Sequence, residues 1–95
     1  MITKKLNTAT LFKALADETR LSIVRKLAAD GCEVPGSEIV ASCAQFHQLS
    51  QPAISHHFSK LVAAGVLEER KKGTEKYYQL NSKLLVKSGI VPEKI

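Results

Sequence analysis

The feature that most restricts the fold of this chain is the segment over residues 50–65. It opens with Ser50, a residue type that caps helices, and Pro52 is tolerated there because the first helical turn does not need its missing N–H. Residues with apolar or no side chains then recur at steps of four, three and four: Ile54, Phe58, Leu61 and Gly65. This spacing places them on one face of a helix, within about 40° of the first of them. We therefore predict a helix from about Ser50 to Ala64 that buries this face and stops at Gly65.

Three shorter helical segments precede this helix. The first covers about residues 8–16, where apolar residues recur at helical spacing. The second follows Asp17, which is suited to cap it, and ends at Gly31. A short third helix is expected over residues 37–43, and residues 44–49 are expected to form a turn. The third and fourth helices with this turn match a helix-turn-helix.

Two short extended runs follow the long helix. Residues 66–70 and 76–81 flank a turn over residues 71–75 that contains a glycine, which indicates a β-hairpin. The alternation of side chains along the second run predicts that Tyr78 and Leu80 face the core. A hairpin directly after a helix-turn-helix is typical of a wing.

The remaining chain is short. Residues 82–88 suit one last helix, and the residues after Gly89 are expected to fray. A length of 95 residues is enough for one domain and too short for two. The predicted fold class is therefore mainly α, with one winged helix-turn-helix domain over residues 1–95 and a C-terminal β-hairpin wing. A second subunit would cover apolar surface that so small a core leaves exposed.

The composition excludes several other classes of protein. Hydrophobic residues make up 44% and charged residues 24% of the chain, so disorder is not expected. No apolar run approaches the roughly 20 residues that span a bilayer, and no apolar stretch follows the basic N-terminus. We therefore expect no membrane association and a cytoplasmic location. Two cysteines, Cys32 and Cys43, are too few for a disulfide scaffold and are expected to be free thiols.

The distribution of charge is more informative than its total. The net charge of +5 and the pI of about 9.4 fit a polyanionic partner. No lysine or arginine lies between Lys26 and Lys60, whereas seven basic residues lie from Lys60 to Lys87. The carboxylates that oppose them in this second stretch are Glu68, Glu69 and Glu75. Positive charge is therefore concentrated beside the long helix.

The long helix carries the groups that contact with duplex DNA requires. These are cations for phosphates, an element that fits the major groove, and short polar side chains that reach base edges. Gln51 could form two hydrogen bonds with an adenine edge, and Lys60 is better placed for phosphate. The outer face has no carboxylate from Ser50 to Ala64. The expected DNA contacts on this helix are Ser50, Gln51, Ser55, His56, His57, Ser59 and Lys60.

The hairpin adds a second basic segment. The polar outer face of an amphipathic helix is usually only solvated, and a basic hairpin tip is often a solvated turn. When a helix face without carboxylates is followed directly by a basic hairpin, the combination favours contact with nucleic acid. We expect double-stranded DNA as the partner, with contacts to phosphate or to the minor groove from Arg70, Lys71, Lys72 and Lys76.

Metal binding and thiol chemistry are the alternatives for the histidines and cysteines. His56 and His57 are neighbours on a helix and do not share a face, so we expect DNA contact, or packing of His57, rather than ligation. Cys32, Cys43 and His47 could form an improvised metal site, or they could be two idle thiols and a loop histidine. Thiol oxidation is also conceivable, although neither cysteine has a cationic neighbour in the sequence. We expect no metal site and no cofactor.

Several segments resemble the ArsR (SmtB/ArsR) family of winged helix repressors. LFKALADETRL at residues 11–21 is similar to the opening signature of that family, and LSQPAISHH at residues 49–57 is similar to the start of its recognition helix. Residues 61–67 and YYQLN at residues 77–81 resemble the end of that helix and the returning wing strand. The resemblance covers about residues 8–82.

The resemblance implies a homodimer built from the first and last helices, which would use Leu6, Leu11, Leu84 and Leu85. Each subunit would place its recognition helix in one of two successive major grooves of an inverted repeat near a promoter. Many members of the family are repressors that a ligand, often a metal, releases. The family's third helix often holds a Cys-x-Cys metal motif, but here it has only Cys43, and residues 82–88 lack the Asp, His and Glu ligands of the alternative site. Neither metal site carries over, and the effector and operator stay open.

Two other function classes compete with a DNA-binding regulator. An interaction module could keep the winged fold and lose DNA binding, but the basic hairpin and the helix face without carboxylates argue against it. A steep dependence of affinity on salt would distinguish the two. For an enzyme, the sequence offers no Ser/His/Asp or Cys/His pair in a recognisable context, no glycine-rich phosphate loop and no paired carboxylates. We therefore expect no catalytic activity.

Overall fold

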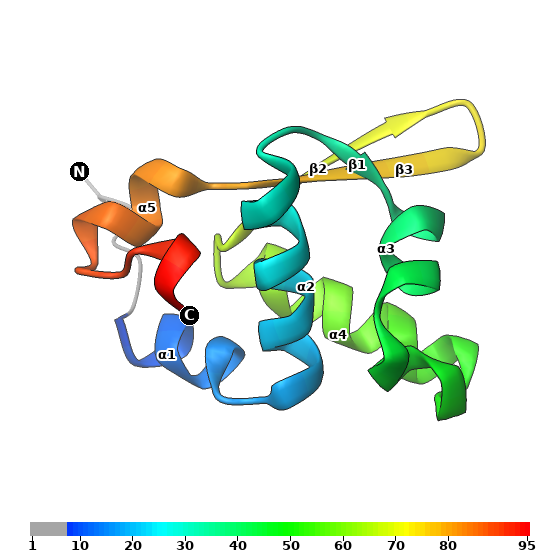
Figure 1. Cartoon of the computed structure of the whole chain (residues 1–95), viewed down its shortest axis with the longest axis horizontal. Coiled ribbons are helices and arrows are strands. Elements are labelled where there is room, and N and C mark those ends of the chain that lie inside the picture. Colours follow the sequence, from blue (N-terminus) through cyan, green and yellow to red (C-terminus); the bar gives the residue numbers. More distant parts are fainter. Residues whose placement is uncertain (1–7) are drawn as a thin grey trace, which may run out of the picture.

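The structure of the chain is a computed structural model that describes residues 8–95. Its helices and strands follow the order helix, helix, strand, helix, 3-10 turn, helix, hairpin, helix and 3-10 turn (Figure 1): α1 (Thr8–Leu15), α2 (Glu18–Asp30), β1 (Val34–Pro35), α3 (Gly36–Ser42), η1 (Ala44–Gln48), α4 (Gln51–Ala63), β2 (Leu67–Lys72), β3 (Glu75–Leu80), α5 (Ser82–Lys87) and η2 (Pro92–Lys94). This arrangement confirms the predicted fold class, a mainly helical winged helix-turn-helix.

Helix α2 lies in the middle of the molecule, and α1, α3 and α4 contact it (Figure 1). Asp17 caps its start, since the carboxylate accepts a hydrogen bond from the backbone N–H of Arg20 at 3.0 Å. At its other end Gly31 adopts a φ of 66°, a left-handed conformation that glycine reaches without a steric cost. Three side chains of α2 are almost fully buried in the core: Ile23, Val24 and Leu27.

Helix α4 begins and ends where the sequence predicts. The Ser50 hydroxyl accepts a hydrogen bond from the backbone N–H of Ala53 at 3.3 Å, and a proline occupies the first turn. Ile54, Phe58 and Leu61 form the buried face. After the helix, Gly65 takes a φ of 83°, and the N–H of Val66 returns to the carbonyl of Leu61 at 2.9 Å. This left-handed stop turns the chain directly into the wing.

The wing is part of a three-stranded antiparallel sheet with the order β1-β3-β2. Leu67 pairs with Leu80 at the base of the hairpin, and Lys72 pairs with Glu75 at its tip. Strand β2 is therefore longer than the sequence indicates, β3 has the expected length but begins one residue earlier, and the turn is shorter. Tyr78 is buried as expected, whereas Leu80 is only half-buried. The hairpin projects away from the helices (Figure 1).

Two features differ from the expectations. The short strand β1 was not predicted from the sequence. It forms because Val34 pairs with Tyr78 and Pro35 pairs with Tyr77. The expected fraying after Gly89 is wrong, because this segment folds back onto α2. Pro92 is buried, and the carbonyl of Ile95 accepts a hydrogen bond from Arg25 Nε at 3.1 Å. None of the helices in residues 8–95 is long and apolar enough to cross a membrane.

Candidate nucleic-acid interface

A stack of three aromatic rings joins the turn, the recognition helix and the wing. Phe58 of α4 lies between Phe46 of η1, with ring centroids 5.9 Å apart, and Tyr78 of β3, with centroids 4.5 Å apart. All three rings are buried. Stacked aromatic pairs contribute beyond the area they bury, so this stack fixes the position of the hairpin relative to α4. No pattern in the sequence indicated that these three residues, from separate elements, meet.

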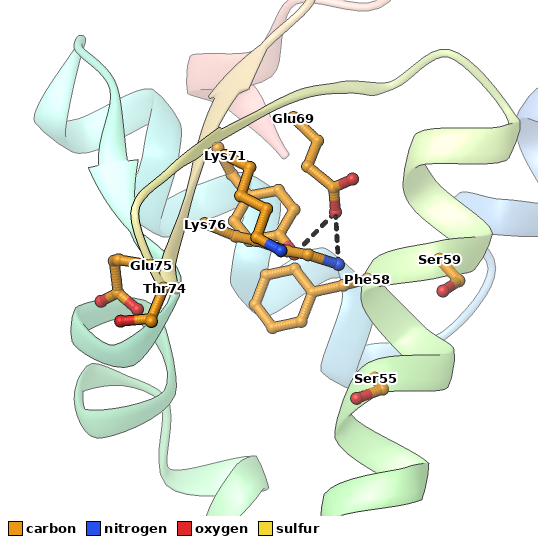
Figure 2. A pocket seen from close by; sticks show the side chains of 10 residues that line it. Ser55, Phe58, Ser59, Glu69, Lys71, Thr74, Glu75 and Lys76 are labelled. Carbon is orange, nitrogen blue, oxygen red and sulfur yellow. Dashed lines mark hydrogen bonds and ion pairs between the residues drawn. The ribbon is translucent and has the colours of Figure 1, made fainter.

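The wing and α4 enclose a cleft of about 380 Å³. Figure 2 shows Ser55 and Ser59 on the helix side of this cleft, and Glu69, Lys71 and Lys76 on the hairpin side. Glu69 accepts a hydrogen bond from the Tyr78 hydroxyl at 2.9 Å and lies 3.6 Å from the ammonium of Lys76. Burial, together with this carboxylate, raises the pKa of the Tyr78 hydroxyl well above its usual range. Tyr78 therefore remains a neutral donor that anchors Glu69.

The outer face of α4 is open to solvent along its length. Of the side chains expected to contact DNA, six are exposed: Ser50, Gln51, Ser55, His56, Ser59 and Lys60. No carboxylate occurs between Ser50 and Ala64. The structure thus brings these six residues together on one surface beside the wing cleft.

His57 differs from the other residues of this set. It is largely buried against α2, with its Nδ1 atom 3.1 Å from Arg20 Nη1 and 3.7 Å from the Asp17 carboxylate. Burial lowers the pKa of His57; the Asp17 carboxylate opposes this shift, and Arg20 and His56 add to it. The structure therefore places His57 in the packing between helices, which is the alternative that the sequence left open for it.

The basic side chains of the wing are partly neutralised by carboxylates. Arg70 forms two hydrogen bonds with Glu33, at 2.7 and 2.8 Å, and lies over the ring of Tyr77. The Arg70 guanidinium lowers the pKa of the Glu33 carboxyl, and Glu33 in turn raises the pKa of Arg70. Lys76 faces Glu69, as described above. Lys71 and Lys72 form no ion pair with any residue of the 8–95 segment.

The wing tip is also tied to the first helix of the helix-turn-helix. Glu75 accepts a hydrogen bond from the Ser37 hydroxyl at 2.7 Å. Gly36 lies so close to the Tyr78 ring that an added Cβ atom would come within 3.2 Å of it. These contacts hold the start of α3 against β3.

The cysteines do not form a ligand cluster. Cys32 is exposed, whereas Cys43 is buried with its Sγ atom 3.8 Å from the carbonyl oxygen of Ser22. Burial raises the pKa of the Cys43 thiol, which disfavours the reactive thiolate. Within residues 8–95, no three His, Cys, Asp or Glu side chains gather as metal ligands would, so the improvised site with His47 is not assembled.

The residues implied for a dimer interface lie in different environments. Leu11 and Leu85 are buried in the core of the single chain, with 2% and 0% exposure, so they have almost no area to offer a partner. Leu84 is half-buried, and Leu6 lies outside the described residues. The large apolar side chains that the described part of the chain exposes are Phe12, Val86 and Val91.

Comparison with known proteins agrees with this fold. The family described as bacterial regulatory protein, arsR family, matches residues 17–69. A helix-turn-helix transcriptional regulator of Methanocaldococcus jannaschii is 39% identical over 72 residues, which cover 76% of this chain and 75% of that protein. The transcriptional repressor SdpR of Bacillus subtilis is 36% identical over 75 residues, covering 79% of this chain and 77% of SdpR.

Solved structures give the same result. The solution structure of a homodimeric winged helix-turn-helix DNA-binding domain from Mycobacterium bovis matches with a TM-score of 0.65 and 26% identity, covering 83% of this chain and 68% of that one. The fold, the exposed helix and the wing together define a winged helix-turn-helix transcriptional regulator. The chain belongs to the ArsR family of bacterial regulatory proteins. This confirms the resemblance found in the sequence, and the matched relatives are regulators rather than enzymes.

Proposed function

We propose that the protein is a homodimeric repressor that binds an inverted repeat in double-stranded DNA. The observation that carries this proposal is the outer face of α4, which is exposed, polar and free of carboxylates. An α-helix with its side chains is about 10–12 Å in diameter, and the major groove is about 12 Å wide, so α4 fits the groove with this face toward the bases. The relative SdpR is a transcriptional repressor, which supports repression rather than activation for this protein.

The proposed contacts follow from the exposure of each side chain. Gln51 and Ser55 would reach base edges, because they lie toward the end of α4 that enters the groove in helix-turn-helix proteins. Lys71 and Lys72 would approach the backbone from the wing. Ser50, His56, Ser59 and Lys60 complete the proposed surface. His57, Arg70 and Lys76 are engaged within the chain, so we assign them to positioning rather than to direct contact.

The proposed dimer uses exposed apolar groups of the helices that the resemblance implies. Phe12 on α1 and Val86 on α5 are 48% and 64% exposed, so both side chains offer apolar area to a partner. A second copy that covers them would remove this area from water. The homodimer of the Mycobacterium bovis domain supports this state. We further propose that residues 1–95 act as one domain, in the cytoplasm where the DNA lies.

Selection of bound duplexes from a random pool tests the proposal. We expect the recovered sequences to share an inverted repeat with half-sites centred one helical turn apart, about 10 base pairs, or a multiple of that. Binding to the recovered duplex should weaken steeply with salt, because bound cations release counterions from DNA. Gln51→Ala is the matched probe for recognition, and Ala41→Gln on the exposed part of α3 is its control. If the wild-type protein binds no duplex even at low salt, the proposal is wrong.

A further inference from the structure

A second cleft lies beside α4, near the C-terminal end of the helix. It has a volume of about 340 Å³ and lies between α1, the start of α2 and α4. Three cations line it, one from each helix: Lys13, Arg20 and Lys60. The remaining lining residues are Thr10, Ala14 and Ala63, so no carboxylate lines this cleft. A concave surface that gathers cations from three helices is suited to an anion.

The Arg20 guanidinium is held in place before any anion arrives. Its Nε atom donates a hydrogen bond to the carbonyl of Ala14 at 2.6 Å, and its Nη1 atom lies 3.1 Å from His57. The third nitrogen, Nη2, has only a long contact of 3.5 Å with the carbonyl of Lys13. A guanidinium carries five N–H donors, so Arg20 retains donors for a ligand. A cation fixed in this way loses little conformational entropy on binding.

The two lysines of the cleft are free of internal ion pairs. Lys13 and Lys60 are both exposed, and no ion pair within residues 8–95 involves either of them. The two carboxylates closest in sequence to Arg20 have other partners: Asp17 accepts from the backbone N–H of Arg20 and lies 3.7 Å from His57, and Glu18 lies 3.6 Å from Arg25. The positive charge of the cleft is therefore available to a ligand.

In the wing, two of the four basic residues are paired with carboxylates, Arg70 with Glu33 and Lys76 with Glu69, whereas Lys71 and Lys72 are not paired within residues 8–95. The hairpin carries four basic residues and three acidic ones, and Glu33 supplies a fourth carboxylate through its pairing with Arg70. An ion pair that opens toward DNA still leaves its carboxylate near the phosphates. Unpaired cations therefore lie not only on the wing, where the sequence concentrates lysine and arginine, but also beside α1.

We infer that the cleft lined by Lys13, Arg20 and Lys60 binds a phosphate group of the DNA backbone, beside the face of the recognition helix that would meet the bases. This inference rests on the proposed function. A helix in the major groove has one sugar-phosphate backbone on each side. Ser55 and Ser59 of α4 line the wing cleft, while Lys60 and Ala63 line this one, so the two clefts border the outer face of α4 at different positions along the helix.

The salt dependence of DNA binding tests this assignment. The variant Lys13→Gln with Lys60→Gln is compared with Arg70→Gln with Lys76→Gln, which removes the same charge from the wing. Each lost phosphate contact should lower the slope of log affinity against log salt by about 0.9 in each bound protomer. We expect the cleft double variant to lose about 0.9 per protomer and the wing double variant to lose less than half of that. Thermal melts by circular dichroism would check that all variants fold.

Inorganic phosphate provides the second arm of the test. It is titrated against chloride at constant ionic strength, while the amide NMR signals of residues 13, 20 and 60 are followed. Weak, saturable shifts of these signals together with the altered DNA slope support the inference. If phosphate binds but the double variant leaves the slope unchanged, the site serves a free anion and the assignment to DNA is wrong. The inference is also wrong if the protein binds no inorganic phosphate and the double variant has the same salt slope as the wild type.

Failure of the proposed function gives a different result. A wild-type protein that binds no duplex removes both the proposed function and this inference. A wild-type protein with a steep slope that Lys13→Gln with Lys60→Gln does not change removes only the inference.

Discussion

Nη1 of Arg20 lies 3.1 Å from Nδ1 of His57 and so joins the start of α2 to the middle of the recognition helix. A guanidinium can only donate, so Nδ1 of His57 must accept, and the imidazole is neutral with its proton on Nε2. The same arginine donates to the carbonyl of Ala14 at the end of α1. One side chain thus links three helices and lines the cationic cleft.

Replacing Arg20 should destabilise the fold more than replacing a surface arginine. Arg20→Met keeps the apolar stem but removes the bonds to Ala14 and His57, and hydrogen bonds to charged groups contribute about 1.5–3 kcal/mol. The free energy of unfolding, measured in urea, should fall by about that amount. Arg25→Met is the control, because its two contacts, an ion pair with Glu18 and a hydrogen bond to the carbonyl of Ile95, are both exposed and should contribute less than the bonds of Arg20. Equal losses in the two variants would contradict this role of Arg20.

The neutral state of His57 makes stability depend on pH. Its folded pKa lies below the ordinary value of 6.5, so the unfolded chain binds more protons between the two values. The contribution of the neutral His57 to stability is therefore fully present above about pH 6.5. It decreases as the pH falls toward the folded pKa. An NMR titration should give a midpoint below 6.5 for the His57 ring. His57→Gln, whose amide oxygen can still accept from Arg20, should remove this part of the pH dependence. A midpoint at or above 6.5 would refute the prediction.

The aromatic stack should be the most sensitive part of the interface. Phe58→Ala removes the middle ring between Phe46 and Tyr78, and truncation of a buried phenylalanine costs about 3–5 kcal/mol. Because the wing is then no longer held against α4, DNA affinity should fall further than the loss of folded protein explains. Tyr77→Ala is the control, since its half-buried ring contacts Arg70 and lies outside the stack. Chemical denaturation and DNA titration on the folded fraction measure the two effects.

The parts of the structure that the sequence predicts correctly depend on contacts between near neighbours in the chain. The Asp17 cap of α2, the Ser50 cap of α4 and the left-handed Gly31 each involve residues within four positions. Helical spacing then identifies the buried face of α4, because a helix repeats its environment every 3.6 residues. These local signals were enough to establish the order of the elements and the fold class.

The features that the sequence missed depend on residues far apart in the chain. Strand β1 is only two residues long and exists because Val34 pairs with Tyr78. Arg70 and Glu33 are 37 positions apart, and the ordered tail depends on Arg25 meeting Ile95. Counting charges along the chain could not identify the cationic cleft, because that site combines residues from three helices.

The exposed apolar residues of α1 and α5 give a test of the dimer. Val86→Glu places a charge on the surface that we propose to be covered, and burial of an unpaired charge costs several kcal/mol. A penalty of about 3 kcal/mol corresponds to roughly a hundredfold weaker dimer, which analytical ultracentrifugation would detect. Ala41→Glu is the control, since it adds the same charge to α3, which lies on the opposite side of α2 from α5 (Figure 1). A Val86→Glu protein that dimerises like the wild type would place the interface elsewhere.

Two variants of α4 should distinguish the recognition of bases from the attraction to phosphates. Gln51 lies exposed in the first turn, where its amide can pair with a base edge, whereas Lys60 lines the cationic cleft. Gln51→Ala should cost about 1–3 kcal/mol at one base pair of each half-site and leave the salt slope unchanged, because it removes no charge. Lys60→Gln should weaken all duplexes alike and lower the slope by about 0.9 per protomer. Selection profiles and salt titrations of both variants provide these two quantities. If Gln51→Ala weakens every sequence equally, the glutamine does not read a base, and the orientation of α4 in the groove must differ from the one proposed.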